Sequence, residues 1–302
     1  MSLAKPALSL AAVPGRRQRT LQLATEIEQR GYAGIYCPSL GDGLALSQGI
    51  AHVTTTIPFG TSVQPIYYRQ PEDYAQTIAF INELAPGRFR FGIGVAHAPS
   101  LANRGLVGGK PLADMQDFVT RLRSAPRAGE LPPLVFATLR RRMIGLAAQL
   151  GDGMVFANAA RSHIGFSLSA LPAARAADEN FFIGNMIPTC VSDDLEAARA
   201  VNRRTLSSYA LLPNYRNYWR EAGYAAEMDA VERCIADQRL DQVGHALSDQ
   251  WLDDTTIAGP PSRVREEVQR WYEAGVKTPI LVPSAIKGGQ MQAFEELFAV
   301  FD

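Results

Sequence analysis

The chain has 302 residues, 47% of them hydrophobic, and its 30 lysines and arginines balance its 30 acidic residues. A chain of this size and composition buries a large core, which is not typical of a disordered segment. Because the formal net charge is zero, no overall field attracts nucleic acid or an anionic membrane, and neither is expected as a partner. Any anion must therefore be bound by a local group of residues.

The three cysteines, Cys37, Cys190 and Cys234, lie far apart and form no CxxC pair. The first residues of the chain include Pro6 and Pro14 and lack the sustained apolar run of a secretory leader. No run is long enough to be expected to span a membrane. We therefore expect the protein in the reducing cytoplasm.

Short apolar runs alternate with helical patterns along the chain. Buried parallel strands read as continuous apolar runs, and eight runs of this kind occupy residues 7–13, 33–37, 57–63, 89–95, 133–137, 153–157, 181–189 and 278–283. Helical patterns lie near residues 17–30, 43–54, 71–84, 112–124, 139–150, 163–176, 192–250 (in several pieces), 262–274 and 289–300.

Eight units of strand and helix favour a (β/α)8 TIM barrel, an α/β fold, over an open doubly wound sheet. We expect residues 1–302 to form one barrel domain. Residues 191–255 are too many for one crossover helix, so we interpret them as a helical insertion between strands seven and eight. The aromatic residues of this insertion either pack its helices against the barrel or contribute to a substrate pocket.

In a barrel of this kind the active site lies at the carboxyl ends of the strands. The residues that follow the apolar runs there are Ser39, Ser62, Val63, Gln64, His97, Thr138, Asn158, Pro283 and Ser284. They include no cluster of metal ligands, no pair of carboxylates and no nucleophile motif. We therefore expect no metal, and a cofactor that supplies the reactive group.

Three arginines, Arg140 to Arg142, stand in the first turn expected for the helix at 139–150. The helix dipole disfavours cations at that end, but a phosphate bound there would be held by both backbone N–H groups and guanidinium groups. Thr138 is expected to cap this helix, whose apolar stripe would be Leu139, Met143, Leu146, Ala147 and Leu150. The alternative is that the arginines lie along a solvated face.

The run "GRFRFGIGVAH" (87–97) carries the best polar candidate. Gly92 and Gly94 are small enough to let a flat ring approach the end of the strand. His97 follows directly, and an imidazole there is suited to exchange a proton with a substrate. The alternative is a structural histidine that bonds to the loop backbone.

Three segments together resemble the luciferase-like monooxygenase family, particularly its branch that uses the deazaflavin coenzyme F420. They are "TTTIPFGTSVQPIYYRQPEDYAQTIAFINELAPGRFRFGIGV" (54–95), "PLVFATLRRRMIGLAAQLGDGMVFAN" (133–158) and "IAGPPSRVREEVQRWYEAGVKTPILVP" (257–283). The resemblance runs from about residue 6 to residue 301. It implies a barrel enzyme, acting on a small-molecule substrate, and a homodimer.

The resemblance also implies roles for individual residues. The third strand would end in a bulge with a non-proline cis peptide bond between Ser62 and Val63, behind the cofactor ring. The cofactor phosphate would bind at Ala137, Thr138 and the following amides, near Arg140 and Arg141. Asn158 would contact the cofactor or the substrate.

Two positions depart from the sugar-phosphate dehydrogenase of that family. Ser39 and Leu40 replace its Asp-His pair after strand two, and His97 replaces its glutamate after strand four. We therefore expect an oxidoreductase that transfers a hydride between F420 and an organic substrate other than glucose 6-phosphate. The alternatives are an FMN-dependent monooxygenase on the same barrel, and a barrel that binds a flavin without catalysis.

Overall fold

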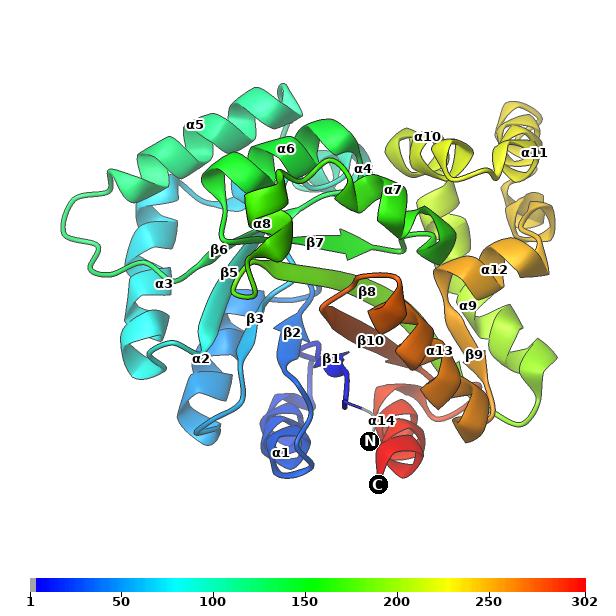
Figure 1. Ribbon diagram of the computed structural model, residues 1–302, viewed down its shortest axis with the longest axis horizontal. Helices are drawn as coiled ribbons and strands as arrows, with labels where there is room; N and C mark the ends of the chain where they lie inside the picture. Colours follow the sequence, from blue (N-terminus) through cyan, green and yellow to red (C-terminus); the bar gives the residue numbers. More distant parts are fainter. Residues whose placement is uncertain (1–3) are drawn as a thin grey trace. The chain divides into compact units, whose positions relative to one another are not determined.

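Each of the eight apolar runs contains an observed strand in the computed structural model, which describes residues 4–302 (Figure 1). Two short strands, β4 and β9, were not expected. The strands are β1 (Ala7–Ser9), β2 (Ile35–Cys37), β3 (Phe59–Thr61), β4 (Gln64–Pro65), β5 (Phe89–Gly94), β6 (Leu134–Ala137), β7 (Gly153–Ala157), β8 (Phe182–Val191), β9 (Ile257–Gly259) and β10 (Thr278–Ser284).

Helices fill the segments between the strands, as the alternating pattern predicts. The α-helices are α1 (Arg17–Gln29), α2 (Gly43–Val53), α3 (Pro71–Leu84), α4 (Ala98–Ala102), α5 (Pro111–Arg123), α6 (Arg141–Leu150), α7 (Ile164–Leu168), α8 (Ala173–Ala177), α9 (Leu195–Ala210), α10 (Pro213–Glu221), α11 (Ala225–Ala236), α12 (Asp249–Thr255), α13 (Pro261–Glu273) and α14 (Gly289–Phe301). Short 3-10 helices are η1 (Ile66–Tyr68), η2 (Arg161–His163) and η3 (Leu240–Ala246).

The chain divides into two units. The N-terminal unit comprises Lys5–Phe156 and Ala170–Gly184, and the C-terminal unit consists mainly of Ala157–Ser169 and Asn185–Asp302. The helix expected at 163–176 is interrupted at this boundary, where α7 and α8 replace it. Pro172 precedes α8 and cannot donate a backbone hydrogen bond, which explains the interruption.

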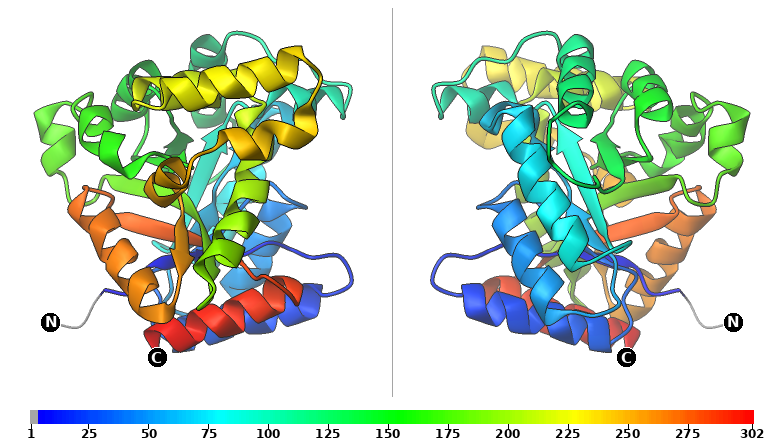
Figure 2. Two further views of the ribbon diagram at one scale, coloured as in Figure 1. Left: turned by 90° about the vertical axis from the view of Figure 1, so that its right-hand side faces the viewer. Right: turned by 90° about the vertical axis from the view of Figure 1, so that its left-hand side faces the viewer.

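The N-terminal unit is a parallel sheet whose strands follow the order β1-β2-β3-β5-β6-β7, with β4 beside β5. Strand β2 aligns Ile35 with Phe59 of β3, and β3 aligns Phe59 with Phe89 of β5. All three side chains are fully buried, as expected for strands in a parallel sheet with its faces covered. Helices α3 and α5 lie side by side on the outside of these strands (Figure 2).

The C-terminal unit holds the expected insertion. Helices α9, α10, α11 and α12 and the short η3 stand between β8 and β9, where Figure 2 shows them in yellow-green to orange. Strand β9 pairs with β8 in parallel, and β10 also pairs with β8. Three fully buried tryptophans form much of this core, namely Trp219 of α10, Trp251 of α12 and Trp271 of α13.

Among the described residues, none of the helices is long and apolar enough to cross a membrane.

Candidate functional site

The segment after β3 begins the site of the N-terminal unit. The expected non-proline cis peptide bond between Ser62 and Val63 is present. Thr61 Oγ1 donates to the Gly92 carbonyl at 2.7 Å, and the Ser62 N–H donates to the Cys37 carbonyl at 2.7 Å. The hydroxyl of Ser62 is buried and makes no hydrogen bond with any described residue. The backbone is thus fixed on both sides, while one polar atom has no partner.

Gly94 at the end of β5 lies against two other residues expected in the site. A Cβ at Gly94 would stand 2.8 Å from Ala137 Cβ and 2.9 Å from Val63 Cγ2. A Cβ at Gly92 would stand 1.9 Å from the Thr61 carbonyl oxygen. On their Cβ side, both glycines therefore make room for the chain itself, and the approach of a flat ring to Gly94 stays a prediction.

Thr138 does not cap the helix that follows it, so this expectation was wrong. Helix α6 begins at Arg141, its N-cap is Arg140, and no side chain caps it. The Thr138 N–H donates instead to the Val155 carbonyl at 2.9 Å, which extends the β6–β7 pairing by one residue. The Thr138 side chain is buried, and its hydroxyl makes no hydrogen bond with any described residue.

The apolar stripe of α6 also differs from the expected one. The buried residues are Ile144, Ala147 and Ala148, whereas the sequence pattern selected Leu139, Met143, Leu146, Ala147 and Leu150. The observed set is the expected Met143, Leu146 and Ala147 shifted by one residue, so the buried face lies about 100° around the helix axis from the expected one.

The arginines of this turn, Arg140 to Arg142, are all exposed. Arg140 and Arg141 bracket the start of α6, where a helix presents N–H groups without intrahelical partners. Exposure is what the solvated-face alternative requires, but it equally leaves the guanidinium groups accessible to a bound anion. Their role in phosphate binding stays a prediction.

His97 is the N-cap residue of α4, three positions after the end of β5. Its backbone carbonyl accepts the Leu101 N–H at 3.1 Å, and its side chain makes no capping bond. Burial lowers the pKa of His97 below its ordinary value. The neutral imidazole is therefore the form present at neutral pH.

Ser39 lies in the turn after β2 and is exposed, and the neighbouring Leu40 is 70% exposed. No described contact ties Ser39 to the residues around Gly94. Among the expected residues of the N-terminal unit, those the structure brings into direct contact are Val63, Gly94 and Ala137.

Asn158 belongs to the C-terminal unit and is enclosed by the helical insertion. Its backbone has a positive φ of 56°, its N–H donates to the Met186 carbonyl at 3.0 Å, and its carbonyl accepts Trp219 Nε1 at 3.1 Å. Its side chain lies beside the phenols of Tyr209 and Tyr215, whose pKa it lowers slightly against the larger effect of burial. It is 4% exposed, and its Nδ2 makes no hydrogen bond with any described residue.

Tyr209 and Tyr215 were not among the site residues expected from the sequence, because neither follows a predicted strand. Both belong to the insertion, and their rings meet edge to face with centroids 5.1 Å apart. Burial raises the pKa of both phenols, so both keep their protons. The only sequence signal was the density of aromatic residues between 209 and 224, which did not distinguish packing from a polar role.

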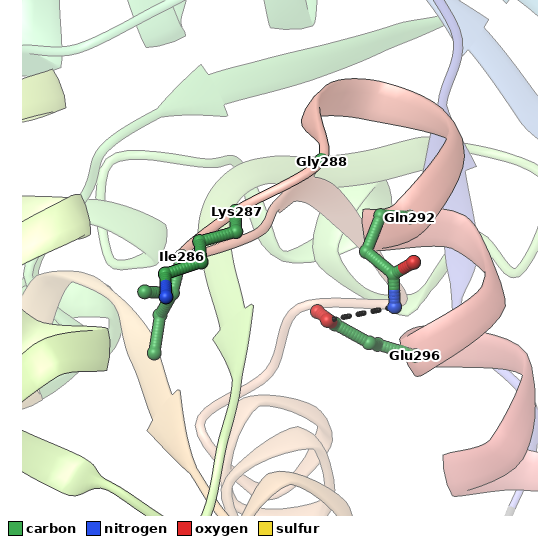
Figure 3. A pocket seen from close by; sticks show the side chains of 5 residues that line it. All are labelled: Ile286, Lys287, Gly288, Gln292 and Glu296. Carbon is green, nitrogen blue, oxygen red and sulfur yellow. Dashed lines mark hydrogen bonds between the residues drawn. The ribbon is translucent and has the colours of Figure 1, made fainter.

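A pocket of about 330 Å³ follows β10 at the start of α14, lined by Ile286, Lys287, Gly288, Gln292 and Glu296 (Figure 3). Gln292 Nε2 donates to Glu296 Oε1 at 3.1 Å. Many barrels bind phosphate after strands seven and eight; here the wall holds one cation, Lys287, and one carboxylate, Glu296. The described residues also contain no group of three or more His, Cys, Asp or Glu that could hold a metal.

Known proteins share this fold. The chain is 26% identical to 5,10-methylenetetrahydromethanopterin reductase of Archaeoglobus fulgidus over 78% of this chain and 80% of that protein. The coenzyme F420-dependent tetrahydromethanopterin reductase from Methanopyrus kandleri superposes with a TM-score of 0.76 at 13% identity, covering 98% of each chain. An F420-dependent secondary alcohol dehydrogenase in complex with an F420-acetone adduct gives 0.71 at 15% identity, covering 99% of this chain and 98% of that one.

These similarities confirm the expected fold, a (β/α)8 barrel with a helical insertion between strands seven and eight. The sequence model of the luciferase-like monooxygenases matches residues 3–125 and 118–278. That match covers most of the chain and both of its units, and it confirms the resemblance of the three segments. The protein is an enzyme, an oxidoreductase, and the chain belongs to the luciferase-like monooxygenase family.

Proposed function

We propose that the protein transfers a hydride between the deazaflavin coenzyme F420 and a small organic substrate. The observation that carries the proposal is a pair of buried hydroxyls, Ser62 Oγ and Thr138 Oγ1, that make no hydrogen bond with any described residue. Each adjoins a residue of the contact formed by Val63, Gly94 and Ala137. Buried polar atoms in native proteins are nearly always hydrogen-bonded, so these two fit a site that is completed by a polar ligand.

The names of the relatives favour F420 over FMN. The reductase of Methanopyrus kandleri and the secondary alcohol dehydrogenase are both described as F420-dependent. An FMN-dependent monooxygenase is the alternative, since the family is named for monooxygenases and a type II Baeyer-Villiger monooxygenase with a similar fold is described in complex with FMN. When bound, the deazaflavin supplies a ring carbon that gives or accepts the hydride.

Residues of this chain would orient the cofactor. Val63 and Ala137 offer apolar surface to a ring, and the hydroxyls of Ser62 and Thr138 offer hydrogen bonds. Exposed Arg140 and Arg141 would attract a phosphate to the start of α6. We also propose that Asn158 contacts the cofactor or the substrate, because its buried Nδ2 makes no hydrogen bond with any described residue.

His97 would move the proton. The lowered pKa keeps its imidazole neutral near pH 7, and a neutral imidazole accepts the proton that a hydroxyl or amine loses when the neighbouring carbon gives up a hydride. In the opposite direction the resulting imidazolium returns that proton. Ser39 is exposed and would act only at the mouth of the site.

Titration with F420 and, separately, with FMN tests this proposal. We expect F420 to bind in the micromolar range or more tightly, followed by fluorescence quenching, and reduced FMN to cause no oxygen uptake. Tight FMN binding with oxygen consumption would reverse the order of the two functions. Binding of a flavin with no turnover across a library of alcohols, ketones and imines would favour the non-catalytic barrel.

We also propose that residues 1–302 form one domain and that the enzyme works as a homodimer in the cytoplasm. The family match crosses both units, and the three cysteines are buried and free, as in a reducing compartment. Exposed apolar side chains such as Phe80, Phe166 and Leu240 are available for contact with a second copy. One unfolding transition and a dimer mass in light scattering are the expected observations.

A further inference from the structure

The loop 103–110 joins α4 to α5 in the N-terminal unit, and Asp114 of α5 fastens its far end. Asp114 Oδ2 accepts hydrogen bonds from Tyr67 Oη at 2.6 Å and from the Gly109 N–H at 3.0 Å. The Gly109 N–H also lies 3.4 Å from the Tyr67 hydroxyl, so the three groups meet at one point. Burial and the hydrogen bond to Asp114 raise the pKa of Tyr67 to about 12, and the phenol therefore remains a donor.

This contact tolerates no side chain at position 109. A Cβ at Gly109 would stand 2.5 Å from Asp114 Oδ2, closer than any ordinary contact. The near end of the loop is held separately, because the Arg104 guanidinium lies 4.4 Å from the centre of the Tyr68 ring. The loop is thus fixed at both ends by residues that belong to, or pack on, η1.

The tip between these ends is apolar and uncovered. Val107 is 90% exposed, although an isolated apolar tip gains nothing from water contact. The fastening residues stand close to the proposed site in the chain, because η1 follows the Ser62–Val63 bond by a few residues and the loop follows His97. The contact therefore ties together the two segments that carry those residues.

We propose that the loop 103–110 is a cover for the cofactor site, that Asp114 is the positioning residue that holds it, and that Val107 contacts the bound ring or substrate. The inference rests on the proposed function for the identity of what is covered. The competing explanation is local. Asp114 lies in the first turn of α5, where a carboxylate stabilises the helix without influencing a ligand.

Trypsin cleavage after Arg104 measures the fastening in the protein without cofactor. Asp114→Ala removes both hydrogen bonds, and Gly109→Ala displaces the carboxylate. Asp114→Asn keeps one acceptor oxygen for both donors, since both bonds end on Oδ2. In the control, Gly145→Ala, the added Cβ meets nothing within 4 Å. We expect cleavage about tenfold faster or more in the first two variants, at most about threefold faster in Asp114→Asn, and unchanged in the control.

Stopped-flow dissociation of F420 then tests the cover. We expect the dissociation rate to rise about tenfold in Asp114→Ala and Gly109→Ala, with substantial rescue in Asp114→Asn and no change in the control. Faster cleavage with unchanged dissociation would overturn the cover and leave a helix cap. Unchanged cleavage would overturn the fastening itself. If the unaltered protein binds FMN and not F420, the proposed function is wrong. The dissociation rate of FMN from the same variants then tests whether the loop covers the cofactor.

Discussion

Replacement of Gly94 by alanine tests whether this glycine makes room for the chain or for a bound ring. The new Cβ would stand 2.8 Å from Ala137 Cβ and 2.9 Å from Val63 Cγ2, about 1 Å inside ordinary contact. Overpacking in a core costs about 1–3 kcal/mol. Alanine also restricts the unfolded chain, which favours folding by about 0.4–1 kcal/mol. We therefore expect Gly94→Ala to lower the free energy of unfolding by about 1–2 kcal/mol.

A second substitution relieves half of this clash. Ala137→Gly removes one of the two atoms that the new Cβ meets, so the double variant should recover part of the loss. The two substitutions should show an interaction free energy of about 0.5 kcal/mol or more in favour of the pair. The matched control is Gly145→Ala in α6, whose Cβ meets nothing within 4 Å. It should raise stability by up to about 1 kcal/mol.

Urea unfolding of the cofactor-free variants measures these free energies, and fluorescence titration of F420 measures affinity. The reasoning is refuted if cofactor-free Gly94→Ala is as stable as the original protein and only its affinity for F420 falls. In that case the glycine makes room for the ring, as its position at the end of β5 first indicated. A loss of stability that Ala137→Gly does not relieve would also contradict the packing explanation.

Three other variants probe the proposed site. Thr138→Val should leave stability level or higher, because the hydroxyl has no partner, and should weaken F420 binding by about 0.5–1.5 kcal/mol in the same titration. The double variant Arg140→Ala, Arg141→Ala should bind F420 more weakly by roughly 2–4 kcal/mol at low salt, without loss of stability. Unchanged affinity would support the alternative that both arginines lie on a solvated face and bind no phosphate. For His97, whose pKa burial lowers, the unfolded chain binds more protons just below pH 6.5, so stability should fall on acidification there. His97→Asn should flatten that slope in urea titrations and lower turnover at least about 100-fold.

The strands were predictable because buried parallel strands are continuously apolar. Phe89, Phe91 and Ile93 of β5 are all fully buried, and their run is bounded by glycines at 87 and 94. Strands β4 and β9 have only two and three residues. Neither belongs to one of the predicted apolar runs, unlike the equally short β1, β2 and β3, and each pairs with a neighbouring strand, β5 and β8 respectively.

The start of α6 was not predictable from its pattern. Leu139 and Thr138 look like a helix entry, but the Thr138 N–H bonds to Val155 on the next strand. A contact with a residue seventeen positions away in the chain thus competes with the local cap and delays the helix. The apolar stripe was a separate error of one residue in phase, since the side chain that packs inward is Ile144 and not Met143.

The surroundings of Asn158 could not be predicted from the sequence, for a similar reason. Its partners Tyr209, Tyr215 and Trp219 lie more than fifty positions away in the insertion. Aromatic density in that segment favoured packing and left a role in the site as the alternative. In the structure Trp219 is fully buried, and its Nε1 also donates to the Asn158 carbonyl.

The exposed and the buried groups of the proposed site should respond differently to salt. Arg140 and Arg141 are exposed, so salt screens their attraction for a phosphate over a Debye length of about 8 Å at physiological ionic strength. The hydroxyls of Ser62 and Thr138 are buried, and their hydrogen bonds to a ligand are not screened in this way. Cofactor affinity should therefore fall with salt in the original protein and in Thr138→Val alike, but little in the double arginine variant. Such a salt series separates attraction of the phosphate from recognition of the cofactor.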